Sequence, residues 1–370
     1  MDNNIKLMML ALVTVSFVGG IFVGFALDNG DSGNDSDTRT VIDARGRNVE
    51  VPMEIDSILA IKSCSLELVS FFEAVNKVSY LDVNERFNAN RTHSFMMKEL
   101  LEDLPQLDPE NAEAIFASDV DVIISSTTDP SRLDDESSKY GKPVFAINAD
   151  LEFDDAMFFV QISLLGDLFN EKERANELTD GIKAIISEVS LKSITGAING
   201  YSAGIMFYGA GEFMKSTGDF LPFKYIGVNN IIPTNPAGNR QPYVVSSEVV
   251  LKGDMDYIFL DGSNLQVTIA GNNSLLSNYS IMQNKDAVKE GNIYKVLTYK
   301  DWGTNWQNVL INICYVASIV IGEDTMGWSF EDKADEVLDL FYPNVEKGYA
   351  DLAASQSGNG CGKVNLDDYR

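Results

Sequence analysis

The sequence predicts an α/β protein with two lobes, each built on a mainly parallel sheet, and one long α-helix that joins them. In both halves of the chain, short apolar runs rich in β-branched and aromatic residues alternate with helical patterns. Strands that are separated by helices form parallel sheets. Between the two halves, a single helical pattern continues for about 20 residues, which predicts a stiff connector about 30 Å long.

Seven apolar runs are the predicted strands, and the connecting helix lies between the fourth and the fifth. The strands are predicted over 57–61, 77–81, 121–125, 143–147, 203–208, 256–260 and 292–296. The helix is predicted over 171–192, because Asn170 and Glu173 form a start similar to a capping box. Apolar residues then follow at helical spacing: Ala175, Leu178, Ile182, Ile185 and Val189.

These patterns predict the domain organisation. Residues 1–27 are a signal peptide or a transmembrane anchor, and residues 28–40 are a polar tether. An N-terminal lobe is predicted over 41–152, a helical connector over 153–195 and a C-terminal lobe over 196–345. We expect residues 346–370 to form a flexible tail, because this segment is rich in Gly and Ser.

The amino terminus has the features of a targeting segment. No charged residue lies between positions 7 and 27, and this run is long enough to cross a hydrocarbon core of about 30 Å. Lys6 precedes the run and several aspartates follow it, which predicts that the folded part is extracytoplasmic. Gly24 and Ala26 form a small-x-small pattern that a signal peptidase could cleave, so an anchored and a secreted protein both remain open.

Composition argues against several classes of function. The chain has 28 Lys and Arg against 55 Asp and Glu, and a net charge of −27 is unsuited to binding nucleic-acid phosphates. A single histidine, His93, excludes sites that need two or three imidazoles, so we predict no metal centre and no cofactor. Three cysteines are too few for a disulfide framework, and Cys314 lies on an apolar helix face that predicts burial.

Candidate ligand-binding residues lie in the loops after the predicted strands, because parallel sheets bring ligands to the carboxyl ends of their strands. Arginines and polar residues in these loops can donate to an anionic ligand, and aromatic rings can stack on its apolar face. The candidates are Ser63, Cys64, Arg86, Ser126 and Thr127 in the first lobe, and Tyr208, Arg240, Asp301 and Trp302 in the second.

Each candidate also has a purely structural interpretation. Large aromatic residues such as Tyr208 and Trp302 pack at strand ends as often as they line pockets. Loop arginines such as Arg240 are frequently solvated on the surface. Cys64 fits a helix start as well as a ligand contact, and we expect His93 to be exposed in a polar loop.

The two halves of the chain contain a similar segment. Residues 107–125 and 244–261 each predict a short helix, an Asp-x-Asp triplet and an apolar strand. Each predicted helix carries a glutamate near its start, Glu113 in the first lobe and Glu248 in the second. This repetition suggests that the two lobes present similar surfaces to a partner.

Several segments resemble, in the right order, the substrate-binding proteins of ABC importers for iron-siderophore, haem and cobalamin. They include LPQLDPENAEAIFASDVDVIIS, KYGKPVFAIN, VVSSEVVLKGDMDYIFLDG and AVKEGNIYKVLTYKDWGTNW, and the resemblance extends over about 40–343. It implies two Rossmann-like lobes joined by one helix, the class III periplasmic-binding-protein fold. It also implies capture of a metal chelate in an interlobe cleft and delivery to an ABC permease dimer with its ATPase subunits.

The resemblance implies roles for individual residues. Tyr208, Asp301 and Trp302 match positions that touch ligand in cobalamin-binding relatives, whereas Ser126 and Thr127 replace an aromatic residue found there. That departure argues against a corrinoid ligand. Glu113 and Glu248 match, residue by residue, the glutamates that dock onto permease arginines.

The predicted function is therefore an extracytoplasmic binding protein that does no chemistry on its ligand. It resides at the cell surface or in the periplasm, and the membrane is a partner only if the N-terminal segment stays uncleaved. A surface interaction or adhesion protein is the main alternative, since a tether and an acidic surface suit it equally. An enzyme is a weaker alternative, because one histidine cannot complete a nucleophile-base set and no GxGxxG or GxxxxGK[ST] loop occurs.

Overall fold

The computed structural model describes residues 37–85, 91–194, 198–205, 212–355 and 360–370. Contacts divide the chain into Met1–Asp37 and a compact unit, Thr38–Arg370. The predicted signal peptide or anchor lies outside the described residues. The first strand, β1 (Thr38–Ile42), begins inside the predicted tether, so the last tether residues belong to the folded unit.

The N-terminal lobe is built on a five-stranded sheet in which all pairings are parallel. Its order is β5-β4-β3-β6-β7, and all four residues of the central strand β3 (Ile58–Ile61) are buried. The other strands are β4 (Val78–Asp82), β5 (Gln106–Leu107), β6 (Val122–Ser125) and β7 (Val144–Ala146). A hairpin of β1 and β2 (Asn48–Pro52) precedes this sheet.

The C-terminal lobe has a second five-stranded sheet, of order β10-β8-β12-β13-β14. Its pairings are parallel except at β14, which runs antiparallel to β13. The strands are β8 (Asn199–Ala203), β10 (Asn229–Asn230), β12 (Tyr257–Asp261), β13 (Ile293–Val296) and β14 (Gly362–Lys363). Two short strands, β9 (Lys215–Ser216) and β11 (Tyr243–Val244), form a separate antiparallel pair, and both lie between β8 and β12 in the sequence.

Helices connect the strands in both lobes, as parallel sheets require. In the first lobe they are α1 (Ser65–Val69), η1 (Glu73–Lys77), α2 (Thr92–Met96), α3 (Lys98–Leu101), α4 (Ala112–Ala117), α5 (Pro130–Tyr140) and α6 (Ala156–Phe169). After the connecting helix they are α8 (Leu221–Ile226), α9 (Ser247–Lys252), η2 (Gly262–Asn264), α10 (Leu265–Ala270), η3 (Leu276–Asn278), α11 (Tyr279–Met282) and α12 (Asp286–Lys289). The chain ends with α13 (Trp306–Ala317), η4 (Ser318–Gly322), α14 (Glu323–Met326), α15 (Phe330–Phe341), α16 (Tyr349–Ser355) and η5 (Leu366–Tyr369).

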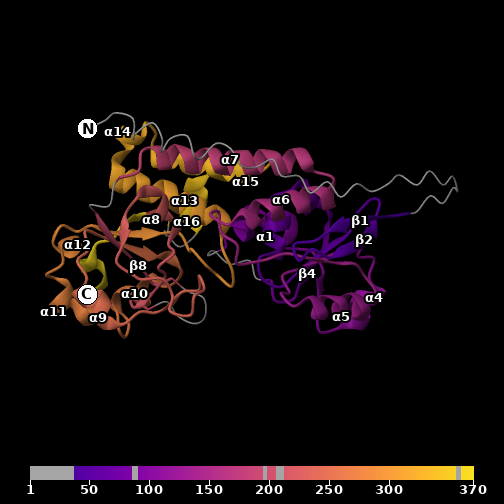
Figure 1. Cartoon of the computed structure of the whole chain (residues 1–370), viewed down its shortest axis with the longest axis horizontal. Coiled ribbons are helices and arrows are strands. Elements are labelled where there is room, and N and C mark those ends of the chain that lie inside the picture. Colours follow the sequence, from indigo (N-terminus) through magenta and orange to yellow (C-terminus); the bar gives the residue numbers. More distant parts are fainter. Residues whose placement is uncertain (1–36, 86–90, 195–197, 206–211, 356–359) are drawn as a thin grey trace, which may run out of the picture. The chain divides into compact units, whose positions relative to one another are not determined.

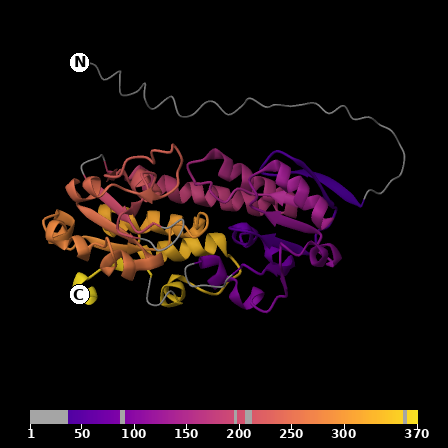
Figure 2. The same ribbon diagram turned by 90° about the horizontal axis from the view of Figure 1, so that it is seen from below.

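The predicted connecting helix is confirmed as α7 (Lys172–Leu191), which runs along both lobes (Figures 1 and 2). Its buried residues are the five apolar positions expected from helical spacing: Ala175, Leu178, Ile182, Ile185 and Val189. The helix packs against α6, which precedes it in the sequence, and against α8, α13 and α15, which follow it. The predicted fold class, two α/β lobes joined by one long helix, is therefore confirmed.

Predicted and observed strands agree closely, with one exception. Six predicted ranges match β3, β4, β6, β7, β12 and β13 to within one residue at each end. The range predicted as 203–208 is wrong in its described part, because the strand there is β8 (Asn199–Ala203), and residues 206–208 lie outside the described residues. Gly200 and Ser202 interrupt the apolar pattern that the prediction relied on, although both residues are buried in the sheet.

The C-terminal segment differs from the expected flexible tail in its described residues. Helix α16 packs against α15 and α2, and β14 completes the edge of the second sheet. The backbone N–H of Cys361 donates to the hydroxyl of Tyr349 at 2.6 Å, which ties the strand to the helix. Backbone pairing with β13 and the packing of α16 therefore hold the described part of this segment, whereas residues 356–359 lie outside the described residues.

The helical run Trp306–Met326 is apolar because it forms the core of the second lobe. By length and composition it could cross a membrane, but every residue of α13 is buried inside the fold. Cys314 lies in this core with no exposed surface, as its apolar helix face predicts. All three cysteines have free thiols.

Arg174, in the first turn of α7, binds the carboxyl ends of two other segments. Its Nε donates to the carbonyl of Phe71 at 2.9 Å, just after α1. Its Nη2 donates to the carbonyls of Leu340 and Phe341, at 2.5 and 3.2 Å, where α15 ends. Helix ends leave carbonyls without partners and favour a cation, so this side chain joins three helices at one point.

We expect Arg174→Met to lower the free energy of unfolding by about 2 to 4 kcal/mol, because it leaves buried carbonyls without a charged donor. Lys172→Met is the matched control: that side chain is 74% exposed and pairs with Asp167, whose side chain is 44% exposed, so its loss should cost less than about 0.5 kcal/mol. Urea unfolding measures both values. Equal values for the two variants would contradict the role of Arg174.

Candidate functional site

Loops at the carboxyl ends of strands from the two lobes contact each other. The loop after β3 and the segment after β13 meet where the thiol of Cys64 lies 3.8 Å from the carbonyl of Thr304. The Thr304 N–H donates to the carbonyl of Ala149 at 3.0 Å. We call this region the interlobe site; it comprises Lys62–Cys64, Glu85, Arg91 and 300–304. It is where a parallel α/β protein is expected to bind a ligand.

Backbone strain concentrates at the interlobe site. Among the described residues, five other than glycine have a positive φ, and Lys62, Cys64 and Trp302 are three of them, with φ of 65°, 62° and 63°. Such conformations cost about 1 to 3 kcal/mol each and persist only where surrounding contacts impose them. Their clustering in facing loops of two lobes marks this region as a functional candidate.

Trp302 lies at the tip of a tight loop. Lys300 and Thr304 form an antiparallel bridge at its base, and the Asp301 N–H donates to the carbonyl of Gly303 at 3.0 Å. Trp302 is 53% exposed, whereas Lys300, Gly303 and Thr304 are buried. The loop therefore places Trp302 at the surface, between residues that are buried or half-buried.

A cation from the first lobe pairs with the loop of the second. Arg91 Nε lies 3.0 Å from Oδ2 of Asp301, and Arg91 Nη1 lies 3.0 Å from Oε1 of Glu85. Burial alone would lower the pKa of Arg91 and raise that of Glu85. The charges of Glu85 and Asp301 outweigh burial at Arg91 and raise its pKa, whereas contacts with His93 and then with Arg91 outweigh burial at Glu85 and lower its pKa.

The polar contacts continue through a buried histidine. His93 Nε2 lies 3.6 Å from Oε1 of Glu85, and its Nδ1 lies 3.9 Å from Oε2 of Glu67. Glu67 Oε1 in turn accepts the backbone N–H of Trp306 at 3.1 Å, at the start of α13. Complete burial raises the pKa of Glu67 to about 8. The expectation that His93 is exposed is wrong, because it is only 3% exposed between two carboxylates.

Two further polar groups flank the site. In the first lobe, Lys62 pairs with Glu136 and with the hydroxyl of Thr127, which is buried at the end of β6. At the base of the Trp302 loop, Lys300 Nζ lies 2.9 Å from Oε1 of Glu152, and both side chains are almost completely buried. Burial raises the pKa of Glu152 although Lys300 opposes the shift.

The structure brings together some of the predicted ligand residues and separates others. Cys64, Asp301 and Trp302 come together at the interlobe site; Ser63 lies beside Cys64 and is half-buried, as is Ser126 next to Thr127. Arg240 forms two ion-pair contacts with Asp154, with Nη2 at 3.1 Å from Oδ2 in one of them. Arg86 and Tyr208 lie outside the described residues.

The sequence also contained residues whose importance was missed. Lys62, Glu67, Glu85 and Glu152 all belong to the polar contacts described above. Glu67 offered a signal, because a carboxylate between two leucines on a short apolar helix must either be exposed or have a partner. Among the described residues, no group of three His, Cys, Asp or Glu side chains could hold a metal ion.

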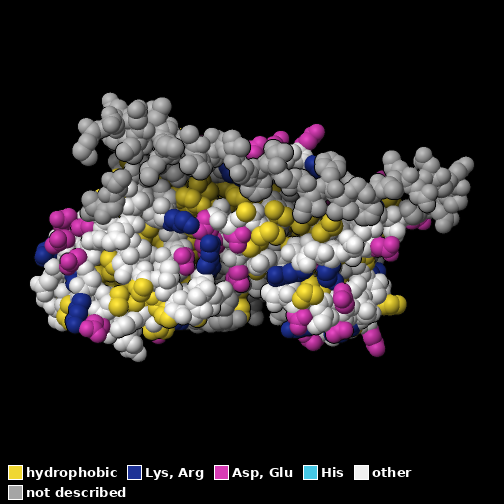
Figure 3. All heavy atoms as spheres, viewed as in Figure 1, with side chains coloured by type: hydrophobic (Ala, Val, Ile, Leu, Met, Phe, Trp, Pro, Cys, Tyr) yellow, Lys and Arg dark blue, Asp and Glu magenta, His cyan; other side chains and the backbone are white. Residues whose placement is uncertain are grey.

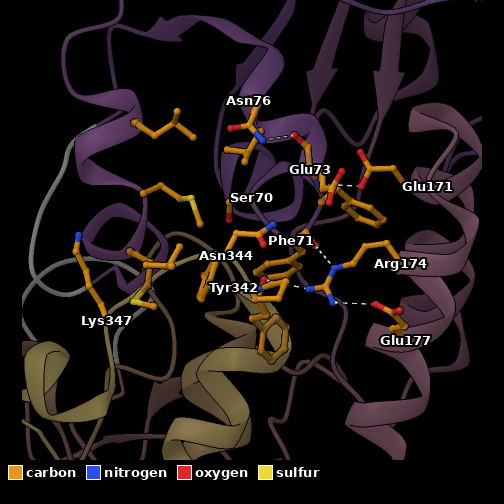
Figure 4. A pocket seen from close by; sticks show the side chains of 18 of the residues that line it. Ser70, Phe71, Glu73, Asn76, Glu171, Arg174, Glu177, Tyr342, Asn344 and Lys347 are labelled. Atoms are coloured by element: carbon orange, nitrogen blue, oxygen red, sulfur yellow. Dashed lines mark hydrogen bonds and ion pairs between the residues drawn. The ribbon is translucent and has the colours of Figure 1, made fainter.

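A cavity of about 1140 Å³ lies at a different place, where the end of α1, the start of α7 and the segment after α15 meet (Figure 4). Apolar side chains including Phe71 and Tyr342 line it together with Arg174 and several glutamates. The carboxylate of Glu171 accepts the N–H groups of Glu73 and Ala74, each at 2.8 Å. No predicted ligand residue lines this cavity.

Comparison with known proteins gives a family match. Residues 104–297, more than half of the chain, match the family model described as periplasmic binding protein. No curated protein matches the sequence.

Solved structures with the same fold have low sequence identity. The molybdate periplasmic binding protein MolA of Haemophilus influenzae, bound to molybdate, is 18% identical with a TM-score of 0.65, over 84% of this chain and 99% of that one. A periplasmic solute binding protein from Veillonella parvula is 15% identical with a TM-score of 0.62, over 89% and 98%. The periplasmic haem binding protein HutB of Vibrio cholerae is 15% identical with a TM-score of 0.53, over 71% and 98%. These similarities establish the fold alone.

The raised pKa of Glu67 predicts a pH dependence of stability. Between about pH 5 and 8 the unfolded chain has lost this proton while the folded protein keeps it, since the pKa rises from 4.5 to about 8 on folding. Stability therefore falls as the pH rises, by up to about 1.4 kcal/mol per pH unit. We expect Glu67→Gln to remove this pH dependence of stability, because glutamine does not titrate. Its amide oxygen can still accept the Trp306 N–H. Urea unfolding at pH 5 to 8 measures the difference, and parallel curves for the two proteins would refute the prediction.

Proposed function

The chain belongs to the periplasmic binding protein family, and we propose that it captures a metal chelate at the interlobe site and delivers it to an ABC permease. Members of this family are extracytoplasmic solute-binding proteins, so the coarse function is binding. The chelate and the delivery are the proposal. One observation supports it best: Trp302 is 53% exposed in the strained loop between the lobes, whereas Lys300, Gly303 and Thr304 in the same loop are buried.

The chemistry around Trp302 suits a large ligand with an apolar face and anionic groups. The indole offers a stacking surface, and the first lobe places the cations Lys62 and Arg91 at the same site. Lys62 already pairs with the carboxylate of Glu136, so it can exchange partners when an anionic group arrives. Iron-siderophore and haem fit this description. A corrinoid fits less well, because the small polar Ser126 and Thr127 stand where an aromatic ring would be needed.

The family fold also accommodates smaller oxyanions, since MolA was solved with molybdate bound. An oxyanion has no apolar face and would make no use of an exposed indole. A surface adhesion protein is the alternative from another class, and it predicts no response to any small ligand. These three possibilities give different results in one binding experiment.

We expect one of haemin, a ferric siderophore or hydroxocobalamin to raise the melting temperature, because a ligand at 100 times its Kd adds about 2.7 kcal/mol of stability. Trp302→Ala should weaken that binding by about 1 to 3 kcal/mol and leave the fold intact. Phe116→Ala is the matched control, since this aromatic is 66% exposed on α4, away from the site.

Native mass spectrometry of protein purified from its own source would identify the bound species. A response to molybdate alone would replace the chelate by an oxyanion. No response to any compound would favour the adhesion alternative. Unchanged affinity with lost stability in Trp302→Ala would show that Trp302 is a packing residue.

Delivery to a permease requires a docking surface on each lobe, and we propose that Glu113 and Glu248 provide it. Both glutamates are exposed and lie in the first turn of a short helix, α4 and α9. Each has a large exposed apolar residue nearby in sequence: Phe116 is 66% exposed and Val244 is 65% exposed. A charged contact beside an apolar one is a common arrangement at protein interfaces.

The acidic surface fits the same proposal. Asp and Glu side chains are spread over both lobes on the face shown in Figure 3, with lysines and arginines between them. Attraction between this surface and a basic permease face would speed encounter and would be screened by salt, whereas two point contacts would set the register.

We expect Glu113→Lys or Glu248→Lys to reduce transport and the stimulation of the ATPase while ligand affinity and melting temperature stay nearly unchanged. The helix-dipole effect of either glutamate is only about 0.3 to 1 kcal/mol, so the fold should tolerate the change. Glu173→Lys, an exposed carboxylate on α7, serves as the control. Wild-type transport in both reversals would show that these carboxylates serve only their helix starts.

A further inference from the structure

We propose that Arg91 is a positioning residue for ligand binding: its ion pair with Asp301 holds the 300–304 loop in the conformation that presents Trp302. This inference rests on the proposed function, because it assigns the ligand to the indole face. It adds a residue that acts through the loop and touches no ligand itself.

The 300–304 loop belongs to the second lobe but is anchored to preceding parts of the chain at each end. At its start, Lys300 Nζ lies 2.9 Å from Oε1 of the buried Glu152. At its end, the Thr304 N–H donates to the carbonyl of Ala149 at 3.0 Å. These two contacts fix the base of the loop. Neither of them involves Asp301, Trp302 or Gly303 at its tip.

The tip is held by Arg91 and by close packing. A Cβ on Gly303 would lie 2.2 Å from Cys64 Sγ, so the backbone approaches the thiol as closely as glycine allows. Asp301, next to Trp302, pairs with Arg91 at 3.0 Å. Because Trp302 has a φ of 63°, which a bulky side chain rarely adopts, the loop needs these contacts to stay in place.

Arg91 also offsets a repulsion within the second lobe. Asp261, at the end of β12, is buried, and its carboxylate accepts the Tyr299 N–H at 2.7 Å. Burial raises its pKa to about 6, and the nearby charge of Asp301 adds to the shift. Without Arg91, the charge of Asp301 would be less compensated beside the buried Asp261, and this repulsion would favour movement of the loop.

The ion pair between Arg91 and Asp301 is partly accessible to solvent. The side chains of Arg91 and Asp301 are 14% and 15% exposed, in contrast to the sealed pair Lys300–Glu152 at 0% and 1%. Arg91 also contacts Glu85 at 3.0 Å, so its position is set from the first lobe. The first lobe thus sets the position of the Arg91 guanidinium, and Arg91 in turn sets the position of Trp302 in the second lobe.

Tryptophan fluorescence of the ligand-free protein tests this inference. The chain has three tryptophans. Trp306 has no exposed surface and Trp328 is half-buried with its N–H on Glu188, so acrylamide should quench mainly Trp302. Subtracting the signal of Trp302→Phe in each background isolates the Trp302 contribution.

We expect Arg91→Met to lower the anisotropy of the Trp302 emission and to change its acrylamide quenching, because the ring samples several conformers. Arg91→Lys should restore part of the signal, since an ammonium pairs with Asp301 but lacks the fork that also reaches Glu85. Arg132→Met, an exposed arginine on α5, is the control and should change nothing. Asp301→Asn provides an independent variant should Arg91→Met fail to fold.

Affinity is measured with whichever of haemin, ferric siderophore or hydroxocobalamin stabilises the wild-type protein. We expect roughly tenfold weaker binding in Arg91→Met. An unchanged Trp302 signal would overturn the positioning role. If affinity still fell, Arg91 would act by touching the ligand, and if affinity did not fall, Arg91 would have no role in binding. If no compound binds the wild-type protein, the proposed function fails, while the fluorescence result still decides the role of Arg91.

Discussion

The packing of α7 against both lobes is the constraint on which the interlobe site depends. Its apolar face contacts α6 on one side and α8, α13 and α15 on the other, and Arg174 binds the last carbonyls of two of the segments it crosses. A helix of 20 residues bends little, so it sets the relation between the lobes before any ligand arrives. Polar contacts between facing loops can then be short and specific.

Those contacts bury charged groups at positions where apolar side chains would cost less free energy. Replacing a buried ion pair by apolar residues is often neutral or stabilising, so pairs such as Lys300–Glu152 are poor evidence for stability. Their value lies in orientation, because a charge has few acceptable partners while a methyl group has many. The path from Asp301 through Arg91, Glu85 and His93 to Glu67 gives the facing loops one arrangement. The left-handed backbone at Lys62, Cys64 and Trp302 costs free energy, and it persists because the surrounding contacts fix that arrangement.

The sequence predicted features that depend on local pattern. Apolar runs located the central strands, helical spacing located α7, and loops after strands pointed to Cys64, Asp301 and Trp302. Features that depend on distant partners were missed. His93 sits in a polar stretch, and only the approach of Glu67 and Glu85 makes it a buried group. The strand β14 is two residues long and contains a glycine, so nothing local signals it, and its existence depends on the open edge of β13.

The same rigidity bears on the proposal that Glu113 and Glu248 are docking groups. Two carboxylates that move independently contribute to register only after the partner has ordered them, and that ordering costs affinity. In this chain Glu113 follows a capped helix start in one lobe, where the Asn111 side chain accepts the Ala114 N–H, and Glu248 follows a capped start at Ser246 in the other. The helix α7 and the polar contacts of the interlobe site hold the two lobes together. A partner with two basic sites would therefore meet a preorganised pair of carboxylates, and it would be sensitive to any ligand that alters the contacts between the lobes.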